Sequence, residues 1–232
     1  MTISRSHRRY RSRSRRGCEP GLPRSYDLRF CSIYTYSPKG QSITSMRSRL
    51  LCSRVKGGAL GWLKSYSTRV CSQMTQHGQF NGFFSERTVL VPVPVCDAST
   101  SLPRWSAQRL AFIFQEMGLG ESVWIGLQRV KPVERSSRAW MWERPTVLSH
   151  YQSFVAMPVS TPPEEVVLVD DVVTKGRTLL AAAMRLRQAF PSTTVRAFAL
   201  VRTMGFLANV ERLFDPCQGQ IRWDGRDAHR DP

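Results

Sequence analysis

A strand–turn–helix–strand pattern in the last third of the chain constrains the fold most strongly. Residues 165–170 form an apolar run that ends in an acidic residue, which is typical of a central parallel strand covered on both faces. Residues 178–190 place apolar side chains at helical spacing and stop at Pro191, and residues 195–201 form another apolar run. This order and length fit a right-handed βαβ crossover. We therefore predict an α/β fold with a parallel sheet flanked by helices.

The chain upstream continues the alternation of helices and strands. Apolar periodicity predicts a helix over residues 58–74 and another over 103–117, while residues 89–91 and 123–127 have the short apolar runs of strands. Residues 131–163 contain five prolines and no clear periodicity. A stretch of this length inside a domain is usually functional or disordered, so residues 131–160 are the candidate hood or lid.

Composition excludes a fully disordered chain and a multispan membrane protein. Hydrophobic residues make up 41% of the 232 residues, and charged residues make up 22%. The apolar runs are far shorter than the roughly 20 residues of a membrane helix, so no membrane association is expected. The net charge of +17 favours polyanionic partners such as nucleic acid, nucleotides or sugar phosphates. The six cysteines contain no C-x-x-C pair, which disfavours a zinc ribbon and favours reduced thiols in the cytoplasm.

Three segments are expected along the chain. Residues 1–45 carry 10 basic and 2 acidic side chains, and the Arg/Ser-rich part at their start predicts a disordered basic tail. This tail could bind nucleic acid weakly, could be a transit peptide, or could precede a true start at Met46; a solvated tail without specific function is favoured. Residues 46–215 are the expected domain, and residues 216–232 are expected to be a polar C-terminal tail.

The turn between the predicted strand and helix has the chemistry of a phosphate site. A glycine at position 176 lets the backbone approach a ligand closely, and the first amides of the following helix have no intrahelical partners. Hydroxyl and cationic side chains surround it, and the five positions of this loop are Thr174, Lys175, Gly176, Arg177 and Thr178. Two carboxylates, Asp170 and Asp171, stand just before it. Acids beside an anion site are explained if the ligand also offers vicinal hydroxyls, as a ribose 5-phosphate does.

This motif carries a resemblance to a known family. The run VVLVDDVVTKGRT at 166–178 resembles the phosphoribosyl-pyrophosphate (PRPP) motif of type I phosphoribosyltransferases. Together with LVPVP at 90–94 and ALVRT at 199–203, it is similar to the ComF-like bacterial group, over roughly residues 50–215. The resemblance implies that Asp170 and Asp171 bind the ribose hydroxyls at the catalytic centre and that residues 174–178 hold the 5-phosphate.

The resemblance also implies the rest of the reaction. Mg²⁺ would enter bound to PRPP rather than on protein ligands, and the phosphoribosyl group would pass to an unspecified base or amine. The loop after the strand at 89–91 would lie near pyrophosphate, and its residues are Pro94, Val95, Cys96 and Asp97. The sequence departs from the family at Lys175, where a small residue is usual, and it lacks the paired cysteines of the family's zinc module. The sequence leaves the oligomeric state open, and a homodimer is one candidate.

Several alternatives stay open beside this interpretation. A non-catalytic adaptor in DNA uptake or nucleic-acid handling would use the basic surface, and a nucleotide-sensing regulator would bind PRPP without turnover. A Walker B segment is disfavoured because no G-x-x-x-x-G-K-[ST] motif is present, and a receiver domain because its acidic pair lies near its first strand. A purely structural role would have Asp171 and Thr174 cap the helix.

Residues near the expected hood also have two possible roles. We interpret Trp140 and Trp142 as packing residues rather than platforms on which a base stacks. We interpret His150 as a structural residue rather than an acid–base catalyst. A cluster of basic residues is interpreted as part of a solvated face rather than as a contact to pyrophosphate. Its members are Arg129, Lys131, Arg135 and Arg138.

Overall fold

A computed structural model describes residues 22–76, 80, 82–95, 105–133, 145–205, 207 and 209–232. The strands of its main sheet are β1 Tyr26–Tyr36, β2 Thr88–Pro92, β3 Ser122–Val123, β6 Glu165–Val173, β7 Thr194–Thr203, β8 Phe214–Trp223 and β9 Ala228–Asp231. A small second sheet holds β4 Leu127–Arg129 and β5 Phe154–Ala156. The helices are α1 Ile43–Gly57, α2 Leu60–Gln76, α3 Ser106–Glu116, α4 Val147–Ser153 and α5 Arg177–Ala189.

The main sheet is mostly parallel. Within the described residues its strand order is β3-β2-β6-β7-β1-β8-β9. The first five strands in that order are mutually parallel, whereas β8 and β9 are antiparallel additions beyond β1. The carboxyl ends of β2, β6, β7 and β1 therefore meet at one edge, which is where ligands bind in open α/β sheets.

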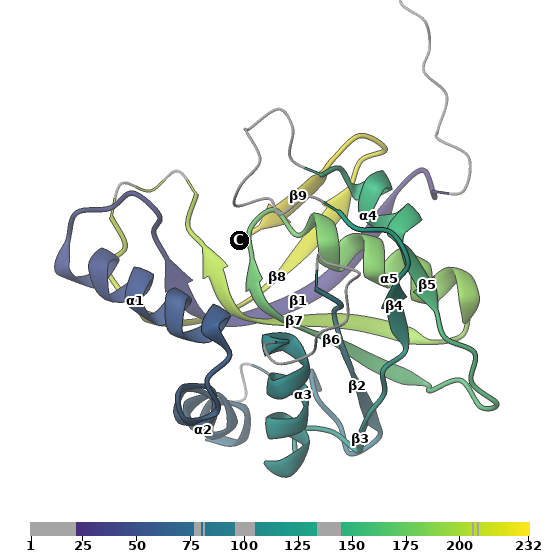
Figure 1. Cartoon of the computed structure of the whole chain (residues 1–232), viewed down its shortest axis with the longest axis horizontal. Helices are drawn as coiled ribbons and strands as arrows, with labels where there is room; N and C mark the ends of the chain where they lie inside the picture. The colour runs from purple at the N-terminus through teal and green to yellow at the C-terminus, as the bar shows by residue number, and fades with distance from the viewer. Residues whose placement is uncertain are drawn as a thin grey trace, which may run out of the picture.

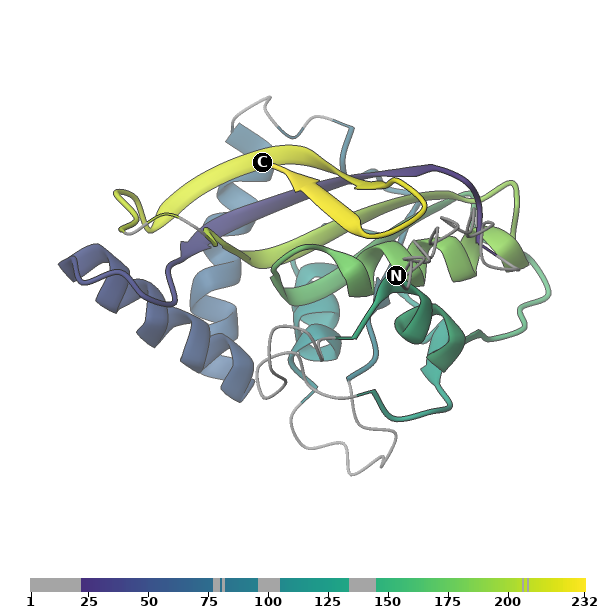
Figure 2. The same cartoon turned by 90° about the horizontal axis from the view of Figure 1, so that it is seen from above.

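Helices cover both faces of this sheet. In Figure 1, α4 and α5 lie above the central strands and α2 and α3 lie below them, and Figure 2 shows the same arrangement from above. One apolar cluster joins α5 to inward residues such as Leu168 and Ala197, and the other joins α1, α2 and α3 to residues such as Val169 and Phe198. Burial on two faces explains why β6 and β7 have continuous rather than alternating apolar runs.

The α/β class and its flanked parallel sheet are confirmed. The predicted βαβ unit is β6–α5–β7, with β6 continuing through the acidic pair to Val173. The helices expected over 58–74 and 103–117 correspond to α2 and α3. The strand expected over 123–127 is wrong in extent, because β3 ends at Val123 and β4 begins only at Leu127.

The predicted tails are wrong in the part of the chain that the structure describes. Residues 26–36 form β1, which lies between β7 and β8 with Leu28 and Phe30 fully buried. The expected C-terminal tail contains most of β8 and all of β9, in which Ile221 and Trp223 are buried. The stretch 131–163, expected to be irregular, contains α4 and β5. Apolar burial in these segments offsets the entropy of ordering them.

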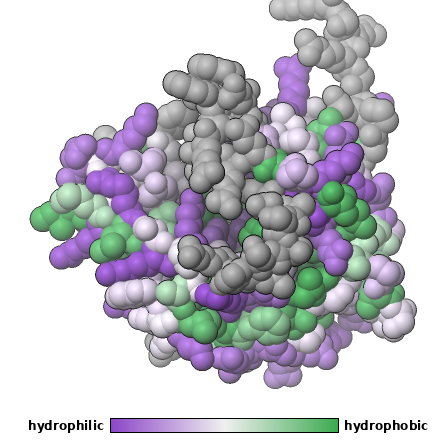
Figure 3. Space-filling model, in the orientation of Figure 1, coloured by the Kyte–Doolittle hydropathy of each residue, from purple (hydrophilic) through white to green (hydrophobic). Residues whose placement is uncertain are grey.

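Some of the exposed large apolar side chains among the described residues gather on α1. Figure 3 shows a mainly hydrophilic face with an apolar patch over α1, where Ile43, Met46 and Leu50 are each about half exposed or more. No helix among the described residues is both long and apolar enough to cross a membrane.

Candidate functional site at the carboxyl edge of the sheet

The two predicted acids lie in the last part of β6. Asp170 and Asp171 are both partly exposed, next to the start of α3. The Ser106 hydroxyl of α3 donates to Asp171 Oδ2 at 2.5 Å, and the Asp171 amide donates to Asp170 Oδ1 at 2.8 Å. These bonds fix both carboxylates at the edge where parallel strands present ligand sites.

The acidic pair is electrostatically strained. Burial, followed by the negative charge of Asp171, raises the pKa of Asp170 well above its ordinary value, while Lys56 of α1 acts in the opposite direction. Two adjacent carboxylates that share a partly dry site favour ligands with hydroxyl donors or a hard cation. Perturbed acids of this kind gather at functional sites more often than elsewhere.

The predicted phosphate loop turns sharply at Gly176. This residue is the N-cap of α5 with φ 84°, and no side chain caps the helix. An added Cβ would lie 2.6 Å from Ile221 Cδ1, so only glycine fits between the loop and β8. The capping role considered for Asp171 and Thr174 is therefore wrong. The start of α5 therefore has no side-chain cap, as an anion site requires.

The two cations of the loop contact the C-terminal hairpin. Arg177 Nε and Nη2 each donate to the Asp227 carboxylate at 2.6 Å, and Lys175 Nζ reaches the same carboxylate at 3.2 Å. The Lys175 side chain is 57% exposed and directed to Asp227, so it does not fill the turn. Burial opposes ionisation of Asp227, but its hydrogen bonds, first from Arg177, lower its pKa to about 2. The carboxylate therefore stays charged and holds both cations.

The two threonines of the loop face neighbouring elements. Thr174 Oγ1 lies 3.2 Å from Thr203 Oγ1 at the end of β7, and Thr178 Oγ1 lies 3.4 Å from His150 Nε2 of α4. His150 is only 2% exposed. Burial, then the positive charges of Arg129 and Arg177, lower its pKa to about 3. The imidazole is therefore neutral near pH 7, which fits the structural interpretation of this residue better than an acid–base role.

His150 should make the protein less stable in mild acid. Its folded pKa is depressed, so the unfolded chain binds the extra proton and stability falls as pH decreases from about 6.5 toward 3. Linkage gives a loss of about 2 kcal/mol between pH 7 and pH 5. We expect His150→Gln to remove that part of the pH dependence in denaturant unfolding. His229→Gln, at an exposed histidine, is the matched control and should leave it unchanged; equal slopes in both variants would contradict the assignment.

The loop after β2 is anchored where the structure describes it. Pro94 is buried and Val95 is exposed, with the Val95 carbonyl accepting from Arg129 Nε at 2.8 Å. Arg129 itself is buried and stacks on Phe154, so its predicted place on a solvated face is wrong. Lys131 is exposed. Other predicted residues lie outside the described part of the chain: Cys96, Asp97, Arg135, Arg138, Trp140 and Trp142.

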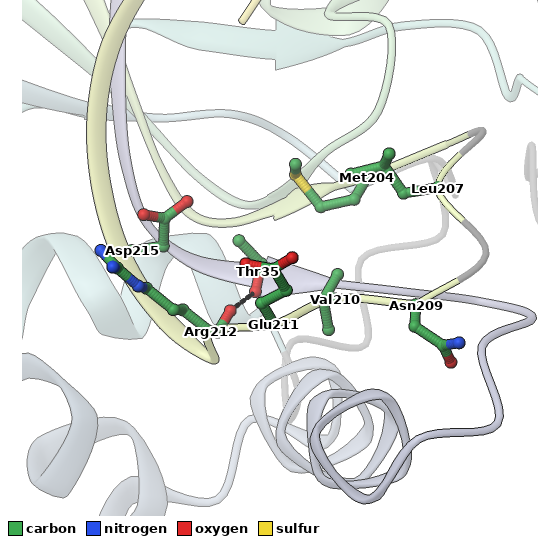
Figure 4. Close-up of a pocket in the computed structure, with 8 residues that line it drawn as sticks. All are labelled: Thr35, Met204, Leu207, Asn209, Val210, Glu211, Arg212 and Asp215. Carbon is green, nitrogen blue, oxygen red and sulfur yellow. Dashed lines mark hydrogen bonds between the residues drawn. The ribbon is translucent and has the colours of Figure 1, made fainter.

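A pocket of about 400 Å³ opens at the same edge of the sheet (Figure 4). Its wall includes Thr35 of β1, Met204 directly after β7, and Asp215 of β8. Thr35 donates to the Arg212 carbonyl, and Asp215 pairs with buried Arg202. Met204 lines the pocket, and the preceding residue, Thr203, contacts Thr174 of the phosphate loop. This end of the pocket is therefore close to the phosphate loop. It offers space at this edge for a second group.

Sequence reasoning missed the partners that these residues acquire in the fold. Ser106 lies in α3, Thr203 ends β7 and Asp227 lies between β8 and β9, so only the fold brings them to the site. Two of them had a usable signal: the Asp-Gly pair at 224–225, typical of a hairpin turn, lies just before Asp227, and Thr203 ends the ALVRT segment at 199–203.

The assembled site joins an acidic pair to a glycine-capped helix start with hydroxyl and cationic side chains. Such a site can hold a ligand that offers both hydroxyl groups and a phosphate. Comparison with protein-family models and with curated proteins finds no match to this chain.

Proposed function

We propose that the protein binds PRPP with Mg²⁺ at the carboxyl edge between β6 and α5 and transfers its phosphoribosyl group to an acceptor. One observation carries the proposal. Asp170 and Asp171 are fixed near the end of β6, and the turn that follows leads through Gly176 to the start of α5, which no side chain caps. The spacing supports a ribose on the carboxylates and its 5-phosphate on the helix amides. On the same basis we propose a type I phosphoribosyltransferase-like fold, with β4, α4 and β5 as its hood.

The residues of the chain supply binding, orientation and charge. The α5 amides and the Thr174 and Thr178 hydroxyls would donate to the 5-phosphate, and the loop after Pro92 would hold the pyrophosphate end. Holding both ends presents C1 of the ribose to the acceptor. The acceptor forms a bond to C1 as the bond from C1 to the pyrophosphate oxygen breaks, and the acceptor's proton is released.

Charge in the site favours that step. Positive charge develops on the sugar ring as the pyrophosphate leaves, and the carboxylates of Asp170 and Asp171 lie on the ribose side where they stabilise it. Their oxygen donors also suit a hard cation beside the ribose hydroxyls. When bound with PRPP, Mg²⁺ would neutralise charge on the departing pyrophosphate.

Calorimetric titration tests the proposal directly. We expect heat on adding PRPP with Mg²⁺, weaker binding of ribose 5-phosphate alone, and no binding of ribose, which lacks the phosphate. Absence of heat with PRPP at millimolar concentration would overturn the proposal. Pyrophosphate release measured across a panel of bases and amines then distinguishes a transferase from a regulator that binds PRPP without turnover.

Asp227 should weaken phosphate binding by competing for the loop cations. Asp227→Asn leaves the hairpin geometry largely intact but frees Arg177 and Lys175 to pair with a phosphate. We expect PRPP affinity to rise about threefold to tenfold, the range of one ordinary net hydrogen bond. Asp231→Asn, on the same hairpin and paired with exposed Arg222, is the matched control and should not change affinity. A decrease in affinity on Asp227→Asn would show that Asp227 orders the loop instead.

A further inference from the structure

A run of hydrogen-bonded residues connects the loop after β2 to the predicted phosphate loop at the start of α5. Arg129 Nε donates to the Val95 carbonyl at 2.8 Å, and its Nη1 donates to the Ser153 hydroxyl. The Ser153 hydroxyl donates to the His150 carbonyl at 2.6 Å, and His150 Nε2 lies 3.4 Å from Thr178 Oγ1. We call Arg129, Ser153 and His150 the relay.

The relay is buried along its whole length. Arg129, Ser153 and His150 are 8%, 1% and 2% exposed, and the guanidinium of Arg129 lies 4.3 Å from the Phe154 ring. Buried polar groups that are hydrogen-bonded in series resist displacement, because breaking one leaves its partner unsatisfied in a medium of low polarity. The relay therefore fixes α4 against both loops. A further bond, from Arg177 Nη1 to the Pro145 carbonyl at 3.1 Å, ties the segment before α4 to the start of α5.

The protonation of His150 sets the direction of its contact with Thr178. The imidazole is neutral, and its Nδ1 has no hydrogen-bond partner among the described residues. A buried unpaired acceptor costs less than a buried unpaired N–H, which favours the tautomer with the proton on Nε2. In that tautomer Nε2–H donates to Thr178 Oγ1. The hydroxyl proton of Thr178 is then free to point at a phosphate.

We propose that the relay sets the spacing between the two loops that bind the opposite ends of PRPP, with Arg129 and His150 as positioning residues. This inference rests on the proposed function. It predicts a specific signature, because spacing matters only to a ligand that contacts both loops at once. A single-ended ligand can bind either loop without the correct separation.

Three ligands separate positioning from a general loss of structure. We expect Ser153→Ala, which removes the middle of the relay, to weaken binding of Mg²⁺–PRPP about fivefold to tenfold, the range of one net hydrogen bond. Ribose 5-phosphate and Mg²⁺–pyrophosphate, each of which reaches one loop, should keep their affinities within about twofold. Equal weakening of all three ligands, or no change for PRPP, would overturn the relay.

Arg185→Gln is the matched control. Arg185 also anchors α4, through the Tyr151 carbonyl at 2.7 Å and its stacking on the Tyr151 ring, but it has no place in the relay. This variant should leave the affinities for all three ligands unchanged. A loss of PRPP affinity equal to that of Ser153→Ala would mean that loosening α4 in any way suffices, and the relay would have no special role.

Amide hydrogen exchange tests the relay even if PRPP does not bind. In the ligand-free protein, Arg129→Gln should speed exchange in peptides covering 93–95 and also in those covering 174–180, on the far side of α4. Arg185→Gln should not affect residues 93–95. Faster exchange near 93–95 alone would contradict the relay, whereas coupled exchange without PRPP binding would leave the relay intact and reject the proposed function.

Discussion

Replacing Asp170 and Asp171 together with asparagine is expected to weaken Mg²⁺–PRPP binding by about 100-fold or more. Hydrogen bonds to charged groups contribute about 1.5–3 kcal/mol each, and the proposed site loses one such bond at each carboxylate. Every 1.4 kcal/mol corresponds to a factor of ten in affinity. Calorimetric titration of the variant against the wild-type protein measures the loss.

The same variant should be at least as stable as the wild type. Burial and the neighbouring charge raise the pKa of Asp170, so the folded state holds its proton longer than the unfolded state does. Wild-type stability therefore falls as pH rises from about 4 through the raised pKa, and asparagine removes this penalty. The asparagine oxygens can still accept the bonds from Ser106 and from the Asp171 backbone amide. A site that gains stability when it loses binding is typical of groups retained for function.

Asp27→Asn is the control for this experiment. Asp27 is exposed near the start of β1, at the amino end of the sheet and away from the site. Its replacement should change neither affinity nor unfolding temperature. If the double variant at 170 and 171 bound PRPP as tightly as Asp27→Asn, the ribose would not lie on these acids. If it unfolded at a lower temperature, the acids would be structural.

The central βαβ unit could be predicted because its signals are local. β6 and β7 are apolar on both faces, and α5 repeats apolar residues at helical spacing before Pro191. Each of these patterns lies within one continuous segment, so composition and period suffice to identify it. The acidic pair and Gly176 followed directly, since they lie at the end of β6 and in the turn that leads from it to α5.

β1 and β8 could not be identified from the sequence in the same way, because polar residues in or beside them hide the strand pattern. β1 follows an arginine-rich segment, which hid the alternation of buried Leu28 and Phe30 with exposed Asp27 and Arg29. β8 carries polar residues at most positions and becomes a strand by pairing with β1. Strand preference depends on such neighbours more than on the segment itself. The partners of the site, such as Asp227 and Ser106, were missed for the same reason: only the tertiary fold brings them together.

Gly176→Ala is expected to destabilise the protein strongly. The residue has φ 84°, and its added Cβ would lie 2.6 Å from the buried Ile221 side chain. Left-handed strain costs about 1–2 kcal/mol and overpacking about 1–3 kcal/mol, so we expect a total of about 2–5 kcal/mol. For a chain of this size that lowers Tm by about 5–15 °C. Binding of PRPP should fall as well, because the first amides of α5 would be displaced.

Two further variants separate the strain from the clash. Gly61→Ala, in α2 with no atom within 4 Å of the added Cβ, should be neutral or slightly stabilising. Adding Gly176→Ala to an Ile221→Ala background, which removes all three side-chain atoms within 3 Å of the new Cβ, relieves the clash but keeps the left-handed backbone, so the Tm loss caused by Gly176→Ala should recover only in part. Full recovery would mean that the clash alone required glycine, and the turn itself would then accept any small residue. No recovery would place the whole cost in the backbone, which is the conformation that points the α5 amides outward.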